Sequence, residues 1–298
     1  MGNHFKGVTL PGTTVELPDR RTLAVETSGS PRGKPVFLLH GTPGSRLGQA
    51  PRSALLSWMG IHLITFDRPG YGDSDRLPGR RIVDGAADVA AVADELGLKE
   101  FAVVGRSGGA PHAMACAALL PDRVIRTAVL VSLAPRNAAG LDWYAGMAPG
   151  NVRDYSSAHD GNVTLAPSLR ARSRDIRKDP YRMVASLKEQ MPDSDRRMVA
   201  DQGVRAMLQA NFREAMRSPE AGGWIDDVAA FSQDWGFDPA AIPGPVLIWH
   251  GQDDVFCPVE HARWLAERIP RSELRIEQGA AHFGVLRYLP QILQWAAR

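Results

Sequence analysis

Short apolar runs alternate with longer segments of helical periodicity through the first 135 residues. The runs Pro35–Leu39, Ile61–Phe66 and Phe101–Gly105 are mainly apolar, which is typical of parallel strands buried on both faces. Between two of them, from Ile82 to Leu96, apolar residues recur every three or four positions, and Gly97 follows where a helix would end. This rhythm predicts an α/β fold with a mostly parallel central sheet flanked by helices.

The same rhythm extends to both ends of the chain. Further strands are predicted at Val8–Leu17, Thr22–Thr27, Ala128–Leu133, Pro245–Trp249 and Leu274–Glu277, and further helices at Ala110–Leu120, Val259–Arg268 and Val285–Ala297.

No strand pattern occurs between Pro135 and Ile242. Helical periodicity is found there around Leu169–Met191, Asp195–Met216 and Trp224–Trp235. We therefore expect one α/β core, residues 1–134 and 243–298, interrupted by a helical cap over 135–242. No repeat or low-complexity linker suggests separately tethered modules.

Composition narrows the class of protein without naming a partner. The 298 residues carry a net charge of +2 and are 44% hydrophobic, so neither a nucleic acid nor a membrane surface is an expected partner. Residues 1–13 lack the apolar centre of a signal peptide, and a cytoplasmic protein is expected. Cys116 and Cys257 lack metal-ligand or CxxC spacing and are predicted to be buried free thiols. Oligomeric state is not readable.

Just after the Phe101–Gly105 run lies a serine with a glycine two residues before it and another two residues after it. The sequence Gly105-Arg106-Ser107-Gly108-Gly109 has the G-x-S-x-G form of a nucleophile elbow, with a predicted strand before it and a helix after it. The sharp turn leaves no room for side chains at the glycine positions and exposes the serine hydroxyl. Ser107 is therefore the candidate nucleophile.

A serine nucleophile needs a base, and the base needs a group that holds its tautomer. Of eight histidines, His282 lies in a Gly- and Ala-rich loop between the last strand and the last helix, whereas His40 is better placed to shape a loop. The acid has two adjacent candidates, Asp253 and Asp254, after the strand that ends at Trp249. The chain order Ser, Asp, His is that of α/β-hydrolases.

The negative charge that forms during attack on a carbonyl needs two N–H donors. One is expected from the backbone of Gly108, directly after the nucleophile. The other is expected from Thr42 in the turn His40-Gly41-Thr42-Pro43-Gly44, which follows an early strand. No metal and no cofactor is required.

Taken in order, these motifs resemble the α/β-hydrolase superfamily, in the branch with a helical lid. The resemblance rests on His40–Ser45, Asp67–Ser74, the elbow, His250–Pro258 and the His282 loop, and so covers nearly the whole chain. It implies that Asp254 is the acid and Asp253 the second choice. It also implies that Asp67 and Tyr71–Ser74 form a structural turn. Arg106 and Ala281 depart from the common pattern, and Arg106 is left either to pair with an acid or to project away.

The resulting hypothesis is a serine hydrolase that cleaves an ester or related acyl bond of a small molecule through an acyl-enzyme. Three alternatives stay open: a carbon–carbon bond hydrolase, a proline-specific aminopeptidase and a catalytically vestigial receptor. The arginines around 170–177 are expected on a solvated face, which weakly favours a neutral or apolar substrate. Candidate apolar pocket residues, each alternatively core, are Trp143, Tyr144, Met147, Met183, Met191, Met198, Met207 and Trp235.

Overall fold

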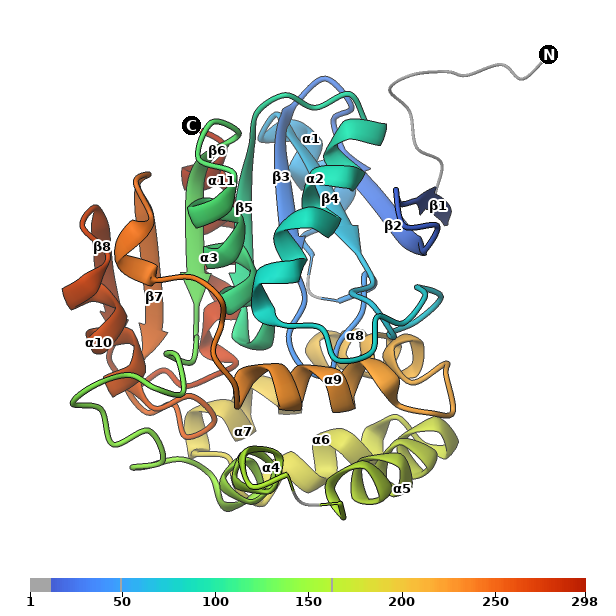
Figure 1. Cartoon of the computed structure of the whole chain (residues 1–298), viewed down its shortest axis with the longest axis vertical. Helices are drawn as coiled ribbons and strands as arrows, with labels where there is room; N and C mark the ends of the chain where they lie inside the picture. Colours follow the sequence, from blue (N-terminus) through green and yellow to red (C-terminus); the bar gives the residue numbers. More distant parts are fainter. Residues whose placement is uncertain (1–11, 49, 162) are drawn as a thin grey trace.

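The computed structural model describes residues 12–48, 50–161 and 163–298. At its centre is a sheet of eight strands in the order β1-β2-β4-β3-β5-β6-β7-β8 (Figure 1). The pairs β1–β2 and β2–β4 are antiparallel and the other five are parallel, so the predicted α/β class with a mostly parallel sheet is confirmed. The strands are β1 (Thr13–Glu16), β2 (Thr22–Gly29), β3 (Lys34–Leu39), β4 (Ile61–Phe66), β5 (Phe101–Arg106), β6 (Val124–Leu130), β7 (Val246–Gly251) and β8 (Ser272–Glu277).

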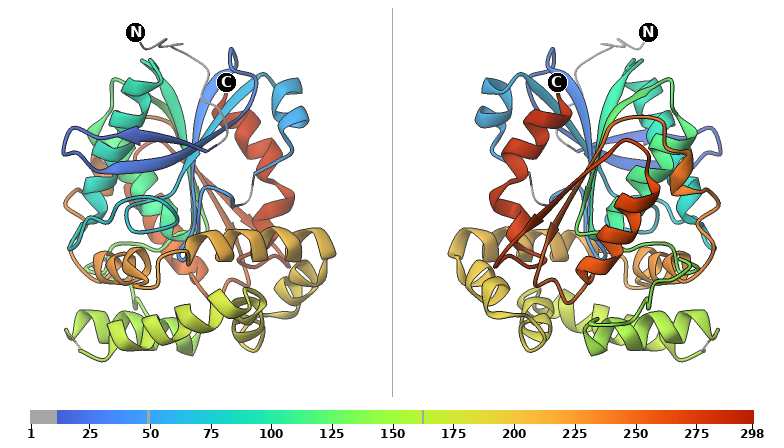
Figure 2. Two further views of the ribbon diagram at one scale, coloured as in Figure 1. Left: turned by 90° about the vertical axis from the view of Figure 1, so that its right-hand side faces the viewer. Right: turned by 90° about the vertical axis from the view of Figure 1, so that its left-hand side faces the viewer.

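Side chains that alternate along the strands bury both faces of the sheet. In β3, Phe37 and Leu39 pack into the larger core with α2 (Gly85–Glu95) and α3 (Ala110–Leu119). Val36 and Leu38 pack into the opposite core, which includes residues of α1 (Ser53–Trp58) and α11 (Leu289–Ala296). Figure 2 shows these two helix layers on either side of the sheet. A further helix, α10 (Val259–Arg268), packs against β7 and β8.

Several boundaries differ from the predicted ones. The predicted strand at Val8–Leu17 falls partly on Val8–Pro11, outside the described residues, and β1 covers part of the rest. The predicted strand at Ala128–Leu133 is wrong at both ends: β6 starts at Val124 and stops at Leu130, since Val131 adopts a left-handed φ of 46° that ends the extended chain.

Two predicted helices begin with a tighter turn. The helix predicted over Ile82–Leu96 is a 3-10 turn, η1 (Ile82–Asp84), followed by α2, and the closing helix is η4 (Gly284–Arg287) followed by α11, which carries Pro290 in its first turn. The six-residue α1 has no counterpart among the predicted helices.

Six helices lie across the carboxyl ends of the parallel strands (Figure 1). They are α4 (Pro149–His159), α5 (Leu165–Lys178), α6 (Tyr181–Lys188), α7 (Asp193–Ala200), α8 (Gln202–Ala215) and α9 (Gly222–Phe231). Within the described residues 135–161 and 163–242 there is no strand, as expected. The exact division into core and cap stays a prediction.

Two of the predicted helical stretches are each divided in two. Pro180 lies between α5 and α6, where its ring cannot continue a helix. Asp201 separates α7 from α8, and its side chain accepts a hydrogen bond from the N–H of Val204 at 3.0 Å, so it caps the second helix.

The two cysteines are free and buried, as predicted. Across the described ranges, no helix has both the length and the apolar character that crossing a lipid bilayer requires.

Substitution of Gly109 tests how closely the chain before α3 packs against the end of β3. A Cβ atom at Gly109 would lie 2.3 Å from the backbone oxygen of Leu39, so Gly109→Ala is expected to lower the free energy of unfolding by about 1–3 kcal/mol. Gly244→Ala is the control, because its nearest atom, Val124 O, lies 3.8 Å away. Urea denaturation measures both, and equal effects would contradict the close packing.

Candidate active site

The chain turns sharply at Ser107, between β5 and α3. The 3-10 turn η2 (Ser107–Gly109) connects them, and Ser107 has a left-handed φ of 52°, a strained conformation for a residue with a side chain. A Cβ at Gly105 would lie 2.4 Å from Gly109 O, so both flanking positions require glycine, as predicted. Ser107 remains partly exposed between buried neighbours.

His282 and Asp254 are joined by a hydrogen bond. His282 Nδ1 lies 2.8 Å from Asp254 Oδ2, and Asp254 Oδ1 accepts the N–H groups of Phe256 and Cys257 at 2.8 and 3.0 Å. A carboxylate only accepts, so Nδ1 donates and Nε2 is left to accept a proton. Asp253 is exposed. The geometry thus pairs Asp254, and not Asp253, with the histidine.

The electrostatic surroundings keep Asp254 ionised. Burial raises the pKa of this carboxyl, but the His282 charge and hydrogen bond outweigh burial and lower the pKa below its usual value. His250, whose Nε2 lies 3.6 Å from Asp254, has its own pKa lowered by burial and is therefore neutral.

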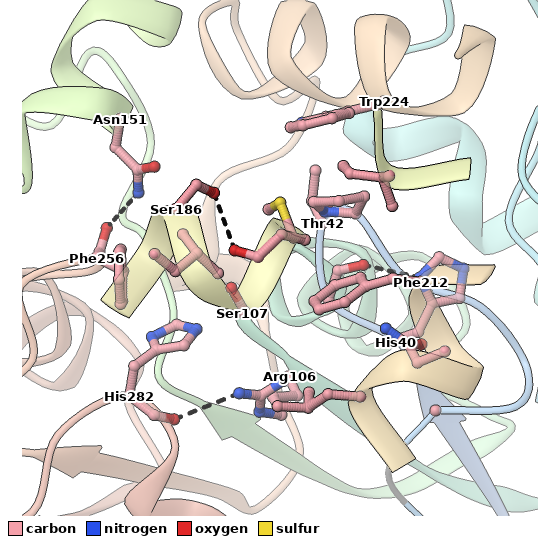
Figure 3. A pocket seen from close by; sticks show the side chains of 18 of the residues that line it. His40, Thr42, Arg106, Ser107, Asn151, Ser186, Phe212, Trp224, Phe256 and His282 are labelled. Carbon is pink, nitrogen blue, oxygen red and sulfur yellow. Dashed lines mark hydrogen bonds between the residues drawn. The ribbon is translucent and has the colours of Figure 1, made fainter. Parts of the chain in front are cut away.

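Ser107 and His282 line the same pocket (Figure 3), although no hydrogen bond joins their side chains in the described structure. The Ser107 hydroxyl lies beside the thiol of Cys257, whose pKa burial raises well above its usual range. A hydrogen bond between a nucleophile and its base is often long without substrate and shortens when substrate binds.

Thr42 and Gly108 lie in contact beside Ser107. A Cβ on Gly108 would lie 2.1 Å from Thr42 Oγ1, so glycine is required here too. His40 shapes this loop, as expected: its ring accepts the N–H of Arg68 at Nε2 and bonds Gly41 O through Nδ1. Burial and Arg68 lower the pKa of His40 far below its usual value, so the ring stays neutral.

A buried carboxylate on α9 binds the Thr42 loop. Asp227 is fully buried and accepts hydrogen bonds from Thr42 Oγ1, from the Arg68 guanidinium and from Tyr71 OH, the last at 2.8 Å. Arg80 Nη2 lies 2.7 Å from Asp227 Oδ1. Burial raises the pKa of Asp227, but the two arginines outweigh burial and hold the pKa well below its usual range.

A second acid from the helices contacts the His282 loop. Asp195 of α7 is fully buried and accepts the backbone N–H groups of His282 and Phe283 at 3.1 and 2.8 Å. Burial raises its pKa to about 6. This contact could not be predicted from local patterns, because 87 residues separate Asp195 from His282 and a single acid in a charged helix has no local signature.

The pocket has a volume of about 600 Å³ between the strand ends and the helices. Of the eight predicted wall residues, the described lining includes Met183 alone, so the pocket role of the other seven is wrong. Trp143, Met147, Met191, Met198 and Trp235 are buried core, and Tyr144 and Met207 pack against it. Apolar walls come instead from Tyr155, Leu208, Phe212, Trp224, Val228 and Phe256.

Comparison with known proteins identifies the class. The family model described as the alpha/beta hydrolase fold matches residues 34–287, and the chain belongs to that family of enzymes. It is 26% identical over 296 residues to a proline iminopeptidase of Xanthomonas citri, covering 90% of each chain. It is also 26% identical over 256 residues to a 2-hydroxymuconate semialdehyde hydrolase of Pseudomonas putida, covering 84% of this chain and 81% of the other.

A solved structure with the same fold is the enol-lactonase of Burkholderia xenovorans LB400. It superposes with a TM-score of 0.68 at 19% identity, over 95% of this chain and 97% of the other.

Removal of the Asp227 charge tests the buried network. Asp227→Asn leaves Arg68 and Arg80 buried without their counter-ion, so the free energy of unfolding is expected to fall by about 3–5 kcal/mol. Asp226→Asn, the adjacent control, should cost no more than about 2 kcal/mol, because its partner Arg76 is 35% exposed and can be hydrated. Urea denaturation measures the free energy of unfolding of both variants. Equal losses would contradict a larger contribution of the Asp227 network to stability.

Proposed function

We propose that this enzyme is a serine hydrolase that cleaves an ester or related acyl bond of a small molecule. The observation that carries the proposal is the His282–Asp254 hydrogen bond of 2.8 Å in the pocket that also holds the strained, partly exposed Ser107. A nucleophile, a base and an orienting acid are the groups that acyl transfer requires.

In the proposed first step, the Ser107 hydroxyl attacks the substrate carbonyl carbon and gives its proton to His282 Nε2. The new bond joins Oγ to that carbon, while the carbonyl electron pair moves onto oxygen. The tetrahedral intermediate then collapses, the bond to the leaving group breaks, and Nε2 returns the proton to that group. Water repeats the sequence on the acyl-enzyme and frees Ser107.

Asp254 acts throughout as a fixed negative charge. Its low pKa keeps it ionised, so that it orients the His282 ring and stabilises the imidazolium that forms when Nε2 takes the proton. The backbone N–H groups of Thr42 and Gly108 are proposed to bind the oxyanion. The contact between these two residues and the Asp227 bond to Thr42 support that role.

Several classes of acyl compound fit this mechanism. Two of the relatives suggest alternative activities for this chain, that of an iminopeptidase and that of a semialdehyde hydrolase. A panel of aryl esters, lactones, aminoacyl amides and vinylogous diketones distinguishes them by the kcat/KM of each.

Replacement of the nucleophile is the first test. Ser107→Ala is expected to lower ester hydrolysis at least about a thousandfold, since the triad acts as a unit. A fluorophosphonate probe should label the wild-type chain and not the variant, as read by intact-mass spectrometry. Labelling and hydrolysis that survive the substitution would refute the mechanism, and an unlabelled wild type would indicate a vestigial site.

The two adjacent acids give a matched second test. Asp254→Asn is expected to lower kcat by about 10³–10⁴, because an amide can hold the His282 ring in the wrong tautomer. Asp253→Asn, at an exposed position, should change kcat by less than about twofold. The reverse order, measured with the same ester, would reassign the acid.

A further inference from the structure

One buried arginine at the pocket lacks a carboxylate partner in the part of the chain that the structure describes. Arg106 precedes Ser107 at the end of β5, lines the pocket and is only 8% exposed. Its Nη2 donates a long hydrogen bond of 3.5 Å to His282 O, and its guanidinium carbon lies 5.1 Å from the centre of the Phe283 ring. Nε is buried without a partner. Within the described residues, no carboxylate lies within ion-pair distance of it.

Three other arginines of this region, two buried and one half-buried, are paired. Arg68 and Arg80 share Asp227, and Arg46 pairs with Asp67 and Glu214. An unpaired buried guanidinium is costly, because it loses hydration without gaining a counter-ion. Arg106 is thus the exception among its neighbours.

Two carboxylates act on Arg106 from a longer distance, and both are occupied. Asp195 is bound by the N–H groups of His282 and Phe283, and Asp254 by His282 and two further N–H groups. Burial lowers the pKa of Arg106 to about 10, while these two acids raise it, so the guanidinium is still charged at neutral pH. An anion entering the pocket would therefore meet a positive charge that no protein group neutralises directly.

The Nη1 end of the guanidinium lies near the nucleophile. A Cβ placed on Gly41 would be 3.4 Å from Ser107 Cβ and 3.8 Å from Arg106 Nη1, so one point of the pocket wall is next to both. Figure 3 shows Arg106 close to His282, joined to its backbone oxygen. One guanidinium balances one negative charge, which matches a single carboxylate.

We infer that the substrate carries a carboxylate close to its scissile bond, and that Arg106 binds this carboxylate. The inference rests on the proposed function, whose substrate class it specifies. It replaces the weak preference for a neutral substrate that the arginines of α5 suggested. Arg172 pairs with Asp154 and Arg170 with Glu220, so these pairs do not neutralise the charge of Arg106.

The test compares esters that differ in charge. On the acyl side the pair is 4-nitrophenyl hydrogen glutarate and neutral 4-nitrophenyl valerate; on the alcohol side it is carboxymethyl butyrate and its methyl ester. For at least one pair, the wild-type kcat/KM should be about tenfold to a hundredfold higher for the anion, the factor expected for a hydrogen-bonded charge. The pair that shows it gives the side of the carboxylate.

Substitution of Arg106 should remove that ratio. Arg106→Met is expected to lower the anionic-to-neutral ratio of kcat/KM at least tenfold, whereas Arg106→Lys should retain part of it, because lysine keeps the charge without the planar fork. Arg136→Met is the matched control: Arg136 stacks on Trp143 and Tyr144 outside the pocket, so its loss should leave the ratio unchanged.

A binding experiment separates this inference from the proposed function. Glutarate should bind Ser107→Ala, and the added Arg106→Met should weaken binding about tenfold or more, as measured by calorimetry. Absence of ester hydrolysis by the wild-type chain, with this binding intact, would refute the serine hydrolase and keep the anion site. The inference would be overturned if Arg106→Met left the anionic-to-neutral ratio of kcat/KM unchanged, as it would if both activities fell equally. It would also be overturned if glutarate bound equally well with and without the Arg106 side chain.

Discussion

The buried carboxylate of Asp227 is the constraint on which the candidate site depends. It brings a negative charge from α9 between Arg68 and Arg80, which come from loops beyond β4, and it also accepts the Thr42 hydroxyl. Each of these groups alone would be expensive to bury, and together they compensate one another. Because the pairing is possible only when α9 lies over the strand ends, one network fixes both the helix and the loop beside Ser107.

The helices support the opposite side of the site in a similar way. Asp195 of α7 holds the backbone at His282, and Asn211 of α8 accepts the N–H of Ser45 at 2.9 Å, in the loop that contains Thr42. A buried N–H without an acceptor costs free energy, so each contact favours one placement of its loop. The helices therefore do more than cover the pocket, since they hold the proposed base and oxyanion loops from outside the sheet.

Local patterns explain what the sequence could predict. The elbow at Ser107, the Asp254 turn and the His282 loop each lie at a strand end, where the chemistry of a few consecutive residues suffices. The contacts of Asp195 and Asp227 could not be predicted, because 87 and 185 residues separate them from His282 and Thr42 and a charged helix offers many equivalent acids. The prediction of the pocket walls failed for a related reason: an apolar side chain on a helix gives the same sequence pattern whether it faces a core or a cavity.

The charge balance of the buried arginines links the fold to the specificity of the site. Arg68 lies just beyond β4 and Arg106 at the end of β5, and both are buried, yet Arg68 is neutralised by a carboxylate of this chain and Arg106 is not. Stability alone would favour a partner or an apolar residue at position 106. An unpaired cation next to the nucleophile is therefore best explained by a ligand that completes it. A substrate that supplies the negative charge offsets the desolvation cost of burying Arg106, which makes position 106 a determinant of what the enzyme accepts.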